Sequence, residues 1–193
     1  MKLILSSSDF RNPESAKFIY DHLDKPISDC RVLYFPNEKA TEESIKSGKF
    51  ECRLMEFGFV KKNIFVFNYY NPAPFFDLDI DVVYISGGNT FGTLKRIRET
   101  GSDRAIINYV HRGAIYIGGS AGAHIAGSNL SHVAQYDTDT YGISDFSGLG
   151  LYDGILICHY DNDRKADLER LKSIGKNAVK VLRNHESILI QDE

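Results

Sequence analysis

The chain has 193 residues, 42% of them hydrophobic and 25% charged, which is an ordinary composition for a globular protein. The net charge of −3 gives no electrostatic basis for binding nucleic acid or an anionic membrane, and no apolar run approaches the roughly 18 residues that a bilayer-spanning helix needs. Three scattered cysteines predict neither a disulfide framework nor a zinc site, and they favour a reducing cytoplasm. We expect one domain over residues 1–193.

Short apolar runs alternate with helical segments along the chain. In the first half we predict a strand at Lys2–Leu5, a helix from Pro13 to Leu23, a strand at Arg31–Phe35, a helix from Thr41 to Phe57 closed by Gly58, and a strand at Asn63–Phe67. In the second half we predict strands at Asp81–Ser86, Ala114–Ile117 and Ile155–Cys158, with helices from Thr90 to Thr100, Asp103 to Arg112 and Asp163 to Ile174. This alternation predicts an α/β fold with a mainly parallel sheet and helices on both faces.

Two further segments depart from the alternation. Ala178–Leu182 and Ser187–Gln191, joined by residues 183–186, predict a C-terminal hairpin. The polar stretch from Asn129 to Gly150 predicts a long functional loop, since long loops without such a role are uncommon.

The pattern with the most chemical content is Gly118-Gly119-Ser120-Ala121-Gly122, which lies where an apolar strand meets a helix. This G-x-S-x-G pattern is typical of a nucleophile elbow, in which small neighbours make room for a sharp turn that exposes the serine oxygen. A glycine-rich turn can also serve only to pack a helix against a sheet. The pattern alone therefore leaves catalysis and packing about equally favoured.

A serine needs a base, and His159 is the best candidate among six histidines. It follows the strand Ile155–Cys158, so it lies at the edge of the sheet where sites of open α/β sheets gather. His132, in the polar loop, stays an open alternative. Cys158 points away from His159 along the strand and is interpreted as a core residue.

An oxyanion formed at Ser120 needs hydrogen-bond donors. The backbone amide of Ala121 is one candidate because it follows the nucleophile. The turn Ser86-Gly87-Gly88-Asn89-Thr90 also follows a strand, and Gly88 could provide the second amide. Taken alone, that turn could instead hold a phosphate.

Three motifs in this order resemble the aspartyl dipeptidase (dipeptidase E) family of serine peptidases, to which cyanophycinases are related. They are Gly87-Gly88-Asn89-Thr90-Phe91, the Ser120 elbow, and His159-Tyr160 after Gly148-Leu149-Gly150-Leu151, and the likeness extends from about Lys2 to Gln191. The resemblance implies a three-layer, flavodoxin-like fold like that of class I glutamine amidotransferases.

The resemblance also implies the site. Ser120 would be the nucleophile, His159 the base, and the amides of Gly88 and Ala121 the oxyanion donors. The third member of the family's triad is an acid about fifteen residues after the serine, which falls at Gln135 without gaps. A short insertion would bring Asp137 there instead, and Asp139 lies close by.

The resemblance further suggests which residues bind substrate. Family members hold the substrate carboxylate with arginines, and Arg164 matches one basic position, while the second arginine, expected near Asp167, is missing. Asn89 is the other residue that we assign to substrate binding. We therefore expect peptides with an acidic amino-terminal residue to be cleaved best, with weaker selectivity than in family members that carry the second arginine.

Together these observations predict a cytoplasmic serine peptidase that cleaves short peptides through an acyl-enzyme, without metal or cofactor. The expected partner is a small peptide, and the sequence predicts no oligomeric state. The alternatives are a hydrolase of isoaspartyl or other amide or ester bonds, and a catalytically silent binding protein of the same fold.

Overall fold

A six-stranded sheet forms the centre of the molecule in a computed structural model that describes residues 1–174 and 178–191. Its strand order is β3-β2-β4-β5-β1-β8, with β8 antiparallel to β1 and the other neighbours parallel. The strands are β1 Lys2–Ser6, β2 Val32–Phe35, β3 Ile64–Val66, β4 Val82–Ile85, β5 Ile115–Gly119 and β8 Ser187–Gln191. Each parallel strand ends at the same edge, which is where the residues of the site gather.

Burial explains why these short runs are strands. Every residue of β2, β4 and β5 is buried, as expected for parallel strands that are covered by helices on both faces. The α-helices are α1 Pro13–Asp21, α2 Glu42–Lys46, α3 Lys49–Glu56, α4 Thr90–Glu99, α5 Ser102–His111, α6 Ala121–Ile125 and α7 Lys165–Ile174. Short 3₁₀ helices lie at Asp9–Arg11, Ile27–Asp29, Lys61–Asn63, Ala73–Phe75, Ser131–Gln135 and Asn162–Arg164.

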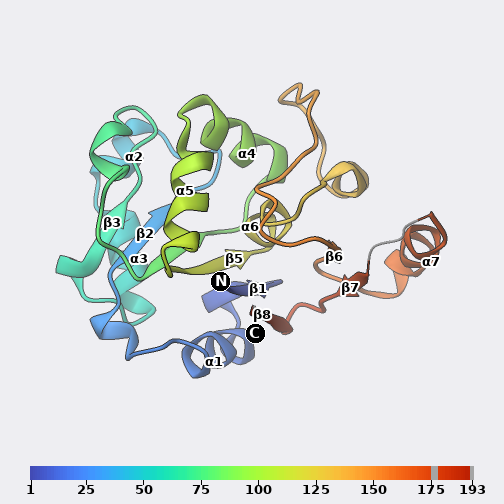
Figure 1. Cartoon of the computed structure of the whole chain (residues 1–193), viewed down its shortest axis with the longest axis horizontal. Helices are drawn as coiled ribbons and strands as arrows, with labels where there is room; N and C mark the ends of the chain where they lie inside the picture. Colours follow the sequence, from blue (N-terminus) through green and yellow to red (C-terminus); the bar gives the residue numbers. More distant parts are fainter. Residues whose placement is uncertain (175–177, 192–193) are drawn as a thin grey trace.

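Helices cover both faces of the six-stranded sheet and form two outer layers, whereas α7 lies beside β7. Helices α4, α5 and α6 lie above the sheet in Figure 1, and α1 lies below it. Helix α3 is on the side of α1, since Tyr20 donates a hydrogen bond to the carbonyl oxygen of Phe57 and Phe10 stacks on Phe57. The expected three-layer α/β fold with a mainly parallel sheet is confirmed. Its organisation as one domain stays a prediction.

The structure differs from the sequence prediction in two of the helices. The helix expected from Thr41 to Phe57 is two helices, because Gly48 adopts a left-handed φ of 78° that an α-helix cannot contain. The helix expected from Asp163 begins as a 3₁₀ turn at Asn162–Arg164 and becomes α-helical only at Lys165.

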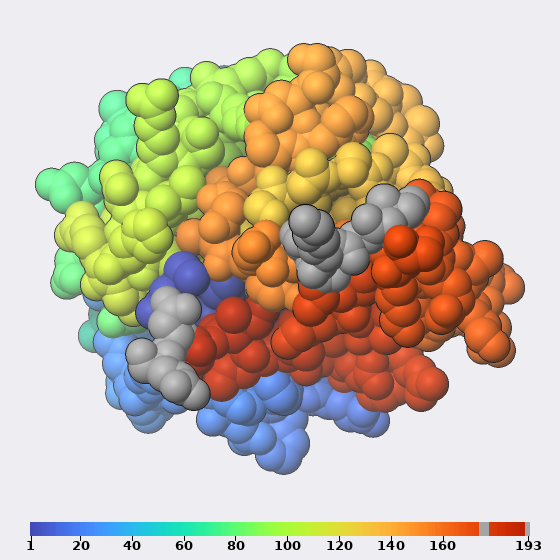
Figure 2. All heavy atoms as spheres, turned by 45° about the vertical axis from the view of Figure 1, so that its right-hand side comes forward, coloured from blue at the N-terminus to red at the C-terminus, as the bar shows by residue number. Residues whose placement is uncertain are grey.

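The C-terminal strand–turn–strand unit is present, and its strands diverge to different partners. Strand β7, Val179–Val181, pairs in parallel with β6, Ile155–Ile157, and these two form a separate small sheet. Strand β8 pairs with β1, so the red C-terminal segment packs against the blue N-terminal one in Figure 2. Since Ser187 lies opposite Ser6, the turn before β8 is placed at the edge where β1 ends.

Among the described helices, none combines the length and apolar character that crossing a membrane requires.

Candidate active site

Ser120 lies between the end of β5 and the start of α6. Its backbone has φ 48° and ψ −103°, a conformation that non-glycine residues rarely adopt. Its neighbours must be small: a Cβ on Gly122 would lie 2.1 Å from the carbonyl oxygen of Ile85, and one on Gly118 would lie 2.7 Å from the backbone of Gly122. The turn therefore has the close packing and the strain of a nucleophile elbow.

The structure brings His159 to Ser120. The distance from Ser120 Oγ to His159 Nε2 is 2.8 Å. His159 follows β6 and also has a positive φ, 54°. Its backbone amide donates to Ser7 Oγ at 2.9 Å, and the buried Ser7 hydroxyl in turn donates to the carbonyl oxygen of Leu182. Ser7 thus fixes the strained backbone of the histidine to the end of β1.

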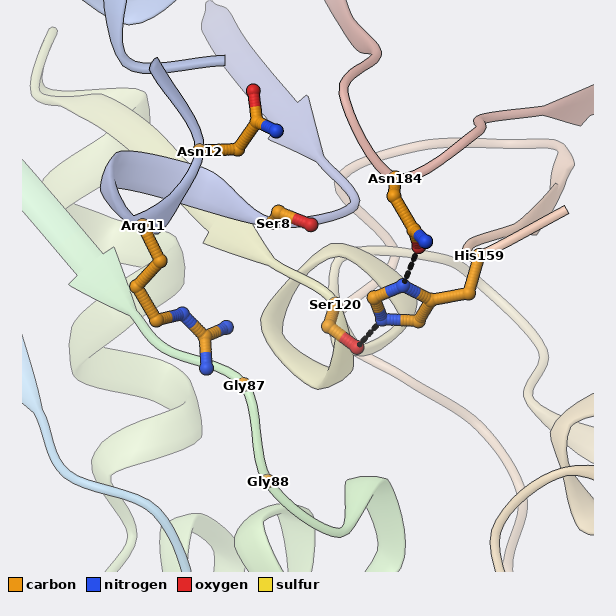
Figure 3. A pocket seen from close by; sticks show the side chains of 8 residues that line it. All are labelled: Ser8, Arg11, Asn12, Gly87, Gly88, Ser120, His159 and Asn184. Atoms are coloured by element: carbon orange, nitrogen blue, oxygen red, sulfur yellow. Dashed lines mark hydrogen bonds between the residues drawn. The ribbon is translucent and has the colours of Figure 1, made fainter. Parts of the chain in front are cut away.

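The other ring nitrogen of His159 is bound by Asn184, from the turn between β7 and β8. Figure 3 shows the ring held between the Ser120 hydroxyl and the Asn184 amide. The distance from Nδ1 to Asn184 Oδ1 is 2.6 Å, and an amide oxygen can only accept, so Nδ1 must carry the proton. Nε2 is then free to accept the hydrogen of the Ser120 hydroxyl.

The expectation that Asp137 or a neighbour contacts His159 is not what the structure shows. The Asp137 carboxylate accepts from the Thr90 backbone amide at 2.7 Å, at the start of α4. The Gln135 amide donates to the carbonyl oxygen of His132, and Asp139 accepts from two amides of its own loop. Asn184 lies next to the imidazole instead. Because β8 pairs with β1, the turn before β8, which contains Asn184, lies at the edge of the sheet where β1 ends.

The alternative base His132 is buried and has another partner, and the same holds for His124 and Cys158, two further groups near the site. His132 donates from Nε2 to the carbonyl oxygen of Leu156 at 2.9 Å, and burial lowers its pKa. Burial lowers the pKa of His124 to about 3 and raises that of the Cys158 thiol to about 12, so each is held in its neutral form. Cys158 is fully buried in the core.

The two expected oxyanion donors lie beside the serine. Within the described residues, the backbone amides of Gly88 and Ala121 donate to no protein group. The turn that contains Gly88 is fixed by Glu38, whose carboxylate accepts from the Asn89 amide at 3.0 Å. Both amides therefore remain available to a ligand next to Ser120.

The two residues assigned to substrate binding have structural partners. Asn89 caps α4, its Oδ1 accepting from Gly92, while its Nδ2 donates to the carbonyl oxygen of Thr138. Arg164 donates to the carbonyl oxygen of Cys158 and stacks on the Tyr136 ring, 4.2 Å from its centre. Neither residue is among those that line the cavity next to Ser120.

That cavity has a volume of about 460 Å³. It is lined by Ser8, Arg11, Asn12, Gly87, Gly88, Ser120, His159 and Asn184. Arg11 is its positively charged side chain, and Asp9 holds the guanidinium at 2.9 Å from Nε and 3.2 Å from Nη2. Burial acts to lower the pKa of Arg11, but the adjacent Asp9 carboxylate outweighs it and the net shift is upward.

Across residues 1–174 and 178–191 there is no group of three His, Cys, Asp or Glu side chains that could hold a metal ion.

Sequence reasoning missed Asn184, Ser7 and Arg11. One signal was available for Asn184: a final strand that runs antiparallel beside β1 necessarily brings its preceding turn to the carboxyl edge. Ser7 and Arg11 follow β1 directly, at the same edge, and their position there was a second signal.

Comparisons with known proteins identify the family of this chain. The family model for peptidase family S51 matches residues 2–193. The uncharacterized peptidase Lin0382 of Listeria innocua is 32% identical over 121 residues, which are 58% of this chain and 56% of that protein. The peptidase E of Citrobacter koseri is 39% identical over 84 residues, 44% of this chain and 36% of that protein. The alignments thus span 56% and 36% of the length of these two curated relatives.

Two solved structures have the same fold. A candidate peptidase E from Listeria monocytogenes EGD-e superposes with a TM-score of 0.72 at 21% identity, covering 98% of this chain and 93% of that one. A peptidase from an acI-B1 actinobacterium gives a TM-score of 0.66 at 16% identity, covering 98% and 83%. The shared fold is that of an α/β protein, in which Ser120 lies at the turn between β5 and α6. Since the family model covers almost the whole chain, the protein belongs to peptidase family S51, and the resemblance to dipeptidase E is confirmed.

Proposed function

We propose that this chain is a serine peptidase that hydrolyses short peptides through an acyl-enzyme. The observation that carries the proposal is the hydrogen-bonded series from Ser120 Oγ to His159 Nε2 and from His159 Nδ1 to Asn184 Oδ1, set in a strained elbow. Family membership supports peptide substrates. Three cysteines without a disulfide fit the predicted cytoplasmic location.

The acylation step follows from the tautomer. His159 Nε2 takes the proton from Ser120 as Oγ forms a bond to the scissile carbonyl carbon. The carbonyl oxygen becomes an oxyanion that the amides of Gly88 and Ala121 would bind. When the carbon–nitrogen bond breaks, the proton on Nε2 passes to the leaving amine, and the ester to Ser120 remains.

The second step repeats the chemistry with water. His159 removes a proton from a water molecule, whose oxygen attacks the ester carbon. The bond to Ser120 Oγ breaks, the serine recovers its proton from Nε2, and a carboxylic acid leaves. Asn184 keeps the ring in one orientation and one tautomer throughout, but it is neutral and supplies no charge to the imidazolium.

Labelling with a fluorophosphonate tests the proposal directly. We expect the probe to modify Ser120 of the wild-type protein, and a dipeptide library to be cleaved only when Ser120 is present. Removing a triad nucleophile lowers turnover by on the order of a millionfold, so Ser120→Ala should be inactive while its melting temperature is retained. A folded protein that neither reacts nor cleaves any peptide or ester would be a silent relative, and labelling elsewhere would identify a different nucleophile.

The preference for an acidic amino-terminal residue is part of the proposal and needs its own test. Rates on Asp-X and Ala-X dipeptides of the same leaving residue measure it. Arg164, which the sequence suggested as the source of this preference, packs on Tyr136 instead of lining the cavity. We therefore infer that a cation lining the cavity carries this preference.

A further inference from the structure

Arg11 is the positively charged residue that shares the cavity with the nucleophile. An ideal Cβ built on Gly87 would lie 2.7 Å from Arg11 Nη2 and 3.3 Å from Ser120 Cβ. The guanidinium and the serine therefore border the same small volume, on either side of Gly87. In Figure 3 the Arg11 side chain extends along the cavity wall toward Gly87.

A buried carboxylate fixes the direction of this arginine. The Asp9 side chain is fully buried, whereas that of Arg11 is 52% exposed. The Asp9 carboxylate accepts hydrogen bonds from Arg11 Nε and Nη2, and another from the Arg11 backbone amide at 3.3 Å. This fork leaves Nη1 with no hydrogen-bond partner in the part of the chain that the structure describes. The donors on Nη1 are thus held in place and available to a ligand.

Asp9 itself is held against its conformational preference. Its φ is 49°, and its amide donates to Ser6 Oγ at 2.9 Å. A Cβ on Gly119 would lie 2.0 Å from Asp9 Oδ2, so the carboxylate occupies the space that any larger residue would need. Strain of this kind persists only where the surroundings impose it, and it tends to be found at functional sites.

A second arginine lies next to the first. A recess of about 60 Å³ adjoins the cavity at Arg11 and Gly87, and its walls include Arg53, Tyr34 and Ser86. Arg53 forms no ion pair within residues 1–174 and 178–191. Asp9 neutralises one of the two positive charges, so the recess keeps a net positive charge together with the hydroxyls of Tyr34 and Ser86.

We propose that Arg11, oriented by Asp9 and assisted by Arg53, binds a carboxylate of the peptide substrate. This inference rests on the proposed peptidase function. The carboxylate has two possible sources, the side chain of an acidic amino-terminal residue and the carboxyl terminus of the peptide. A guanidinium suits both, since it binds a carboxylate through parallel charge-assisted hydrogen bonds.

Four substrates separate the two sources: Asp-X, Ala-X and their carboxyl-terminal amides. Losing one charge-assisted hydrogen bond lowers kcat/KM by about 10- to 100-fold, so we expect Arg11→Met to lose that much on substrates with the recognised carboxylate, mainly through KM. If kcat/KM falls only on Asp-X and its amide, Arg11 binds the acidic side chain. If kcat/KM falls on Asp-X and Ala-X but not on their amides, Arg11 binds the carboxyl terminus of the peptide. Equal loss on all four, or no loss, overturns the proposal.

Three further variants keep the test decisive. Arg11→Met leaves Asp9 buried without its partner, so the double variant Asp9→Asn/Arg11→Met removes both charges and should show the same selectivity change in a stable protein. Arg53→Met, at an exposed position, should lose less on the same substrates. Arg164→Met is the matched control, because that arginine supports the β6 end outside the cavity, and it should lower all four rates equally.

Fluorophosphonate labelling separates this inference from the proposed function. If wild-type Ser120 does not react, the serine peptidase proposal fails. If Ser120 reacts at the same rate in wild type and Arg11→Met, but the four substrates show no selective loss, only the role of Arg11 fails.

Discussion

Replacing Asn184 tests the assignment of the third residue beside the proposed catalytic pair, Ser120 and His159. Asn184→Ala removes the 2.6 Å hydrogen bond to His159 Nδ1. The net value of a neutral hydrogen bond, about 0.5–1.5 kcal/mol, sets a lower limit of about 2- to 12-fold on the loss. General-base catalysis is worth on the order of 10²- to 10⁴-fold, which sets the upper limit. Because this variant no longer fixes the orientation or the tautomer of the His159 ring, we expect kcat/KM to fall by about 10- to 100-fold.

Asn184→Asp should strengthen the contact with His159 Nδ1 that Asn184→Ala removes. An ionised partner stabilises the imidazolium, and charge-assisted hydrogen bonds are roughly twice as strong as neutral ones. Asn184 is exposed, so solvent screens part of this gain, and a rise of about fivefold in kcat/KM is expected, with the acid limb of the pH–rate profile moved to higher pH.

The assay is the pH dependence of kcat/KM on one dipeptide for both Asn184 variants and for Asp137→Asn. The Asp137 carboxylate caps α4 at the Thr90 amide, so its amide variant should lose a little stability and keep most of the activity. If Asp137→Asn is inactive and Asn184→Ala is not, the residue that orients His159 has been misassigned.

The packing and titration of the site give three more predictions. Gly122→Ala, whose Cβ would lie 2.1 Å from the Ile85 carbonyl oxygen, should lower the free energy of unfolding by about 2 kcal/mol or more in denaturant titrations. Cys158 should resist iodoacetamide at pH 8 in the folded protein while exposed Cys52 reacts, because burial raises the Cys158 pKa to about 12; mass spectrometry of the modified chain checks this. His124, whose pKa falls from 6.5 to about 3, binds a proton more readily in the unfolded chain, so stability should be lost as the pH falls below 6.5, by up to about 1.4 kcal/mol per pH unit. His124→Gln should flatten that slope, and an unchanged slope would assign the acid sensitivity to other groups.

The strands of the sheet could be predicted because each one is encoded by a short run of consecutive residues. Strands β2 and β4 are buried along their whole length, so they read as uninterrupted apolar runs in the sequence. The break at Gly48 was missed because an isolated glycine inside a helical pattern is compatible with a continuous helix. The left-handed φ of 78° at Gly48 is what separates the two helices in the structure.

The same distinction applies to the site. The Ser120 elbow is a local pattern of small residues, and His159 directly follows an apolar strand, so sequence reasoning could name both. The orienting residue depends on which strand pairs with β8, and this is a long-range property. Counting from Ser120 leads to Gln135 or Asp137, whereas the pairing of Ser187 with Ser6 leads to the turn that holds Asn184.

Two glycines of the elbow, Gly122 and Gly119, are required for different structural reasons. Gly122 is small because α6 approaches the end of β4, which is the usual reason for glycine in such a turn. Gly119 is small for another reason, since the Asp9 carboxylate fills the space beside it and directs the Arg11 guanidinium into the cavity. One turn thus sets the position of the nucleophile and leaves room for the group that orients a substrate-facing cation. A substitution at Gly119 should therefore alter substrate selectivity as well as stability.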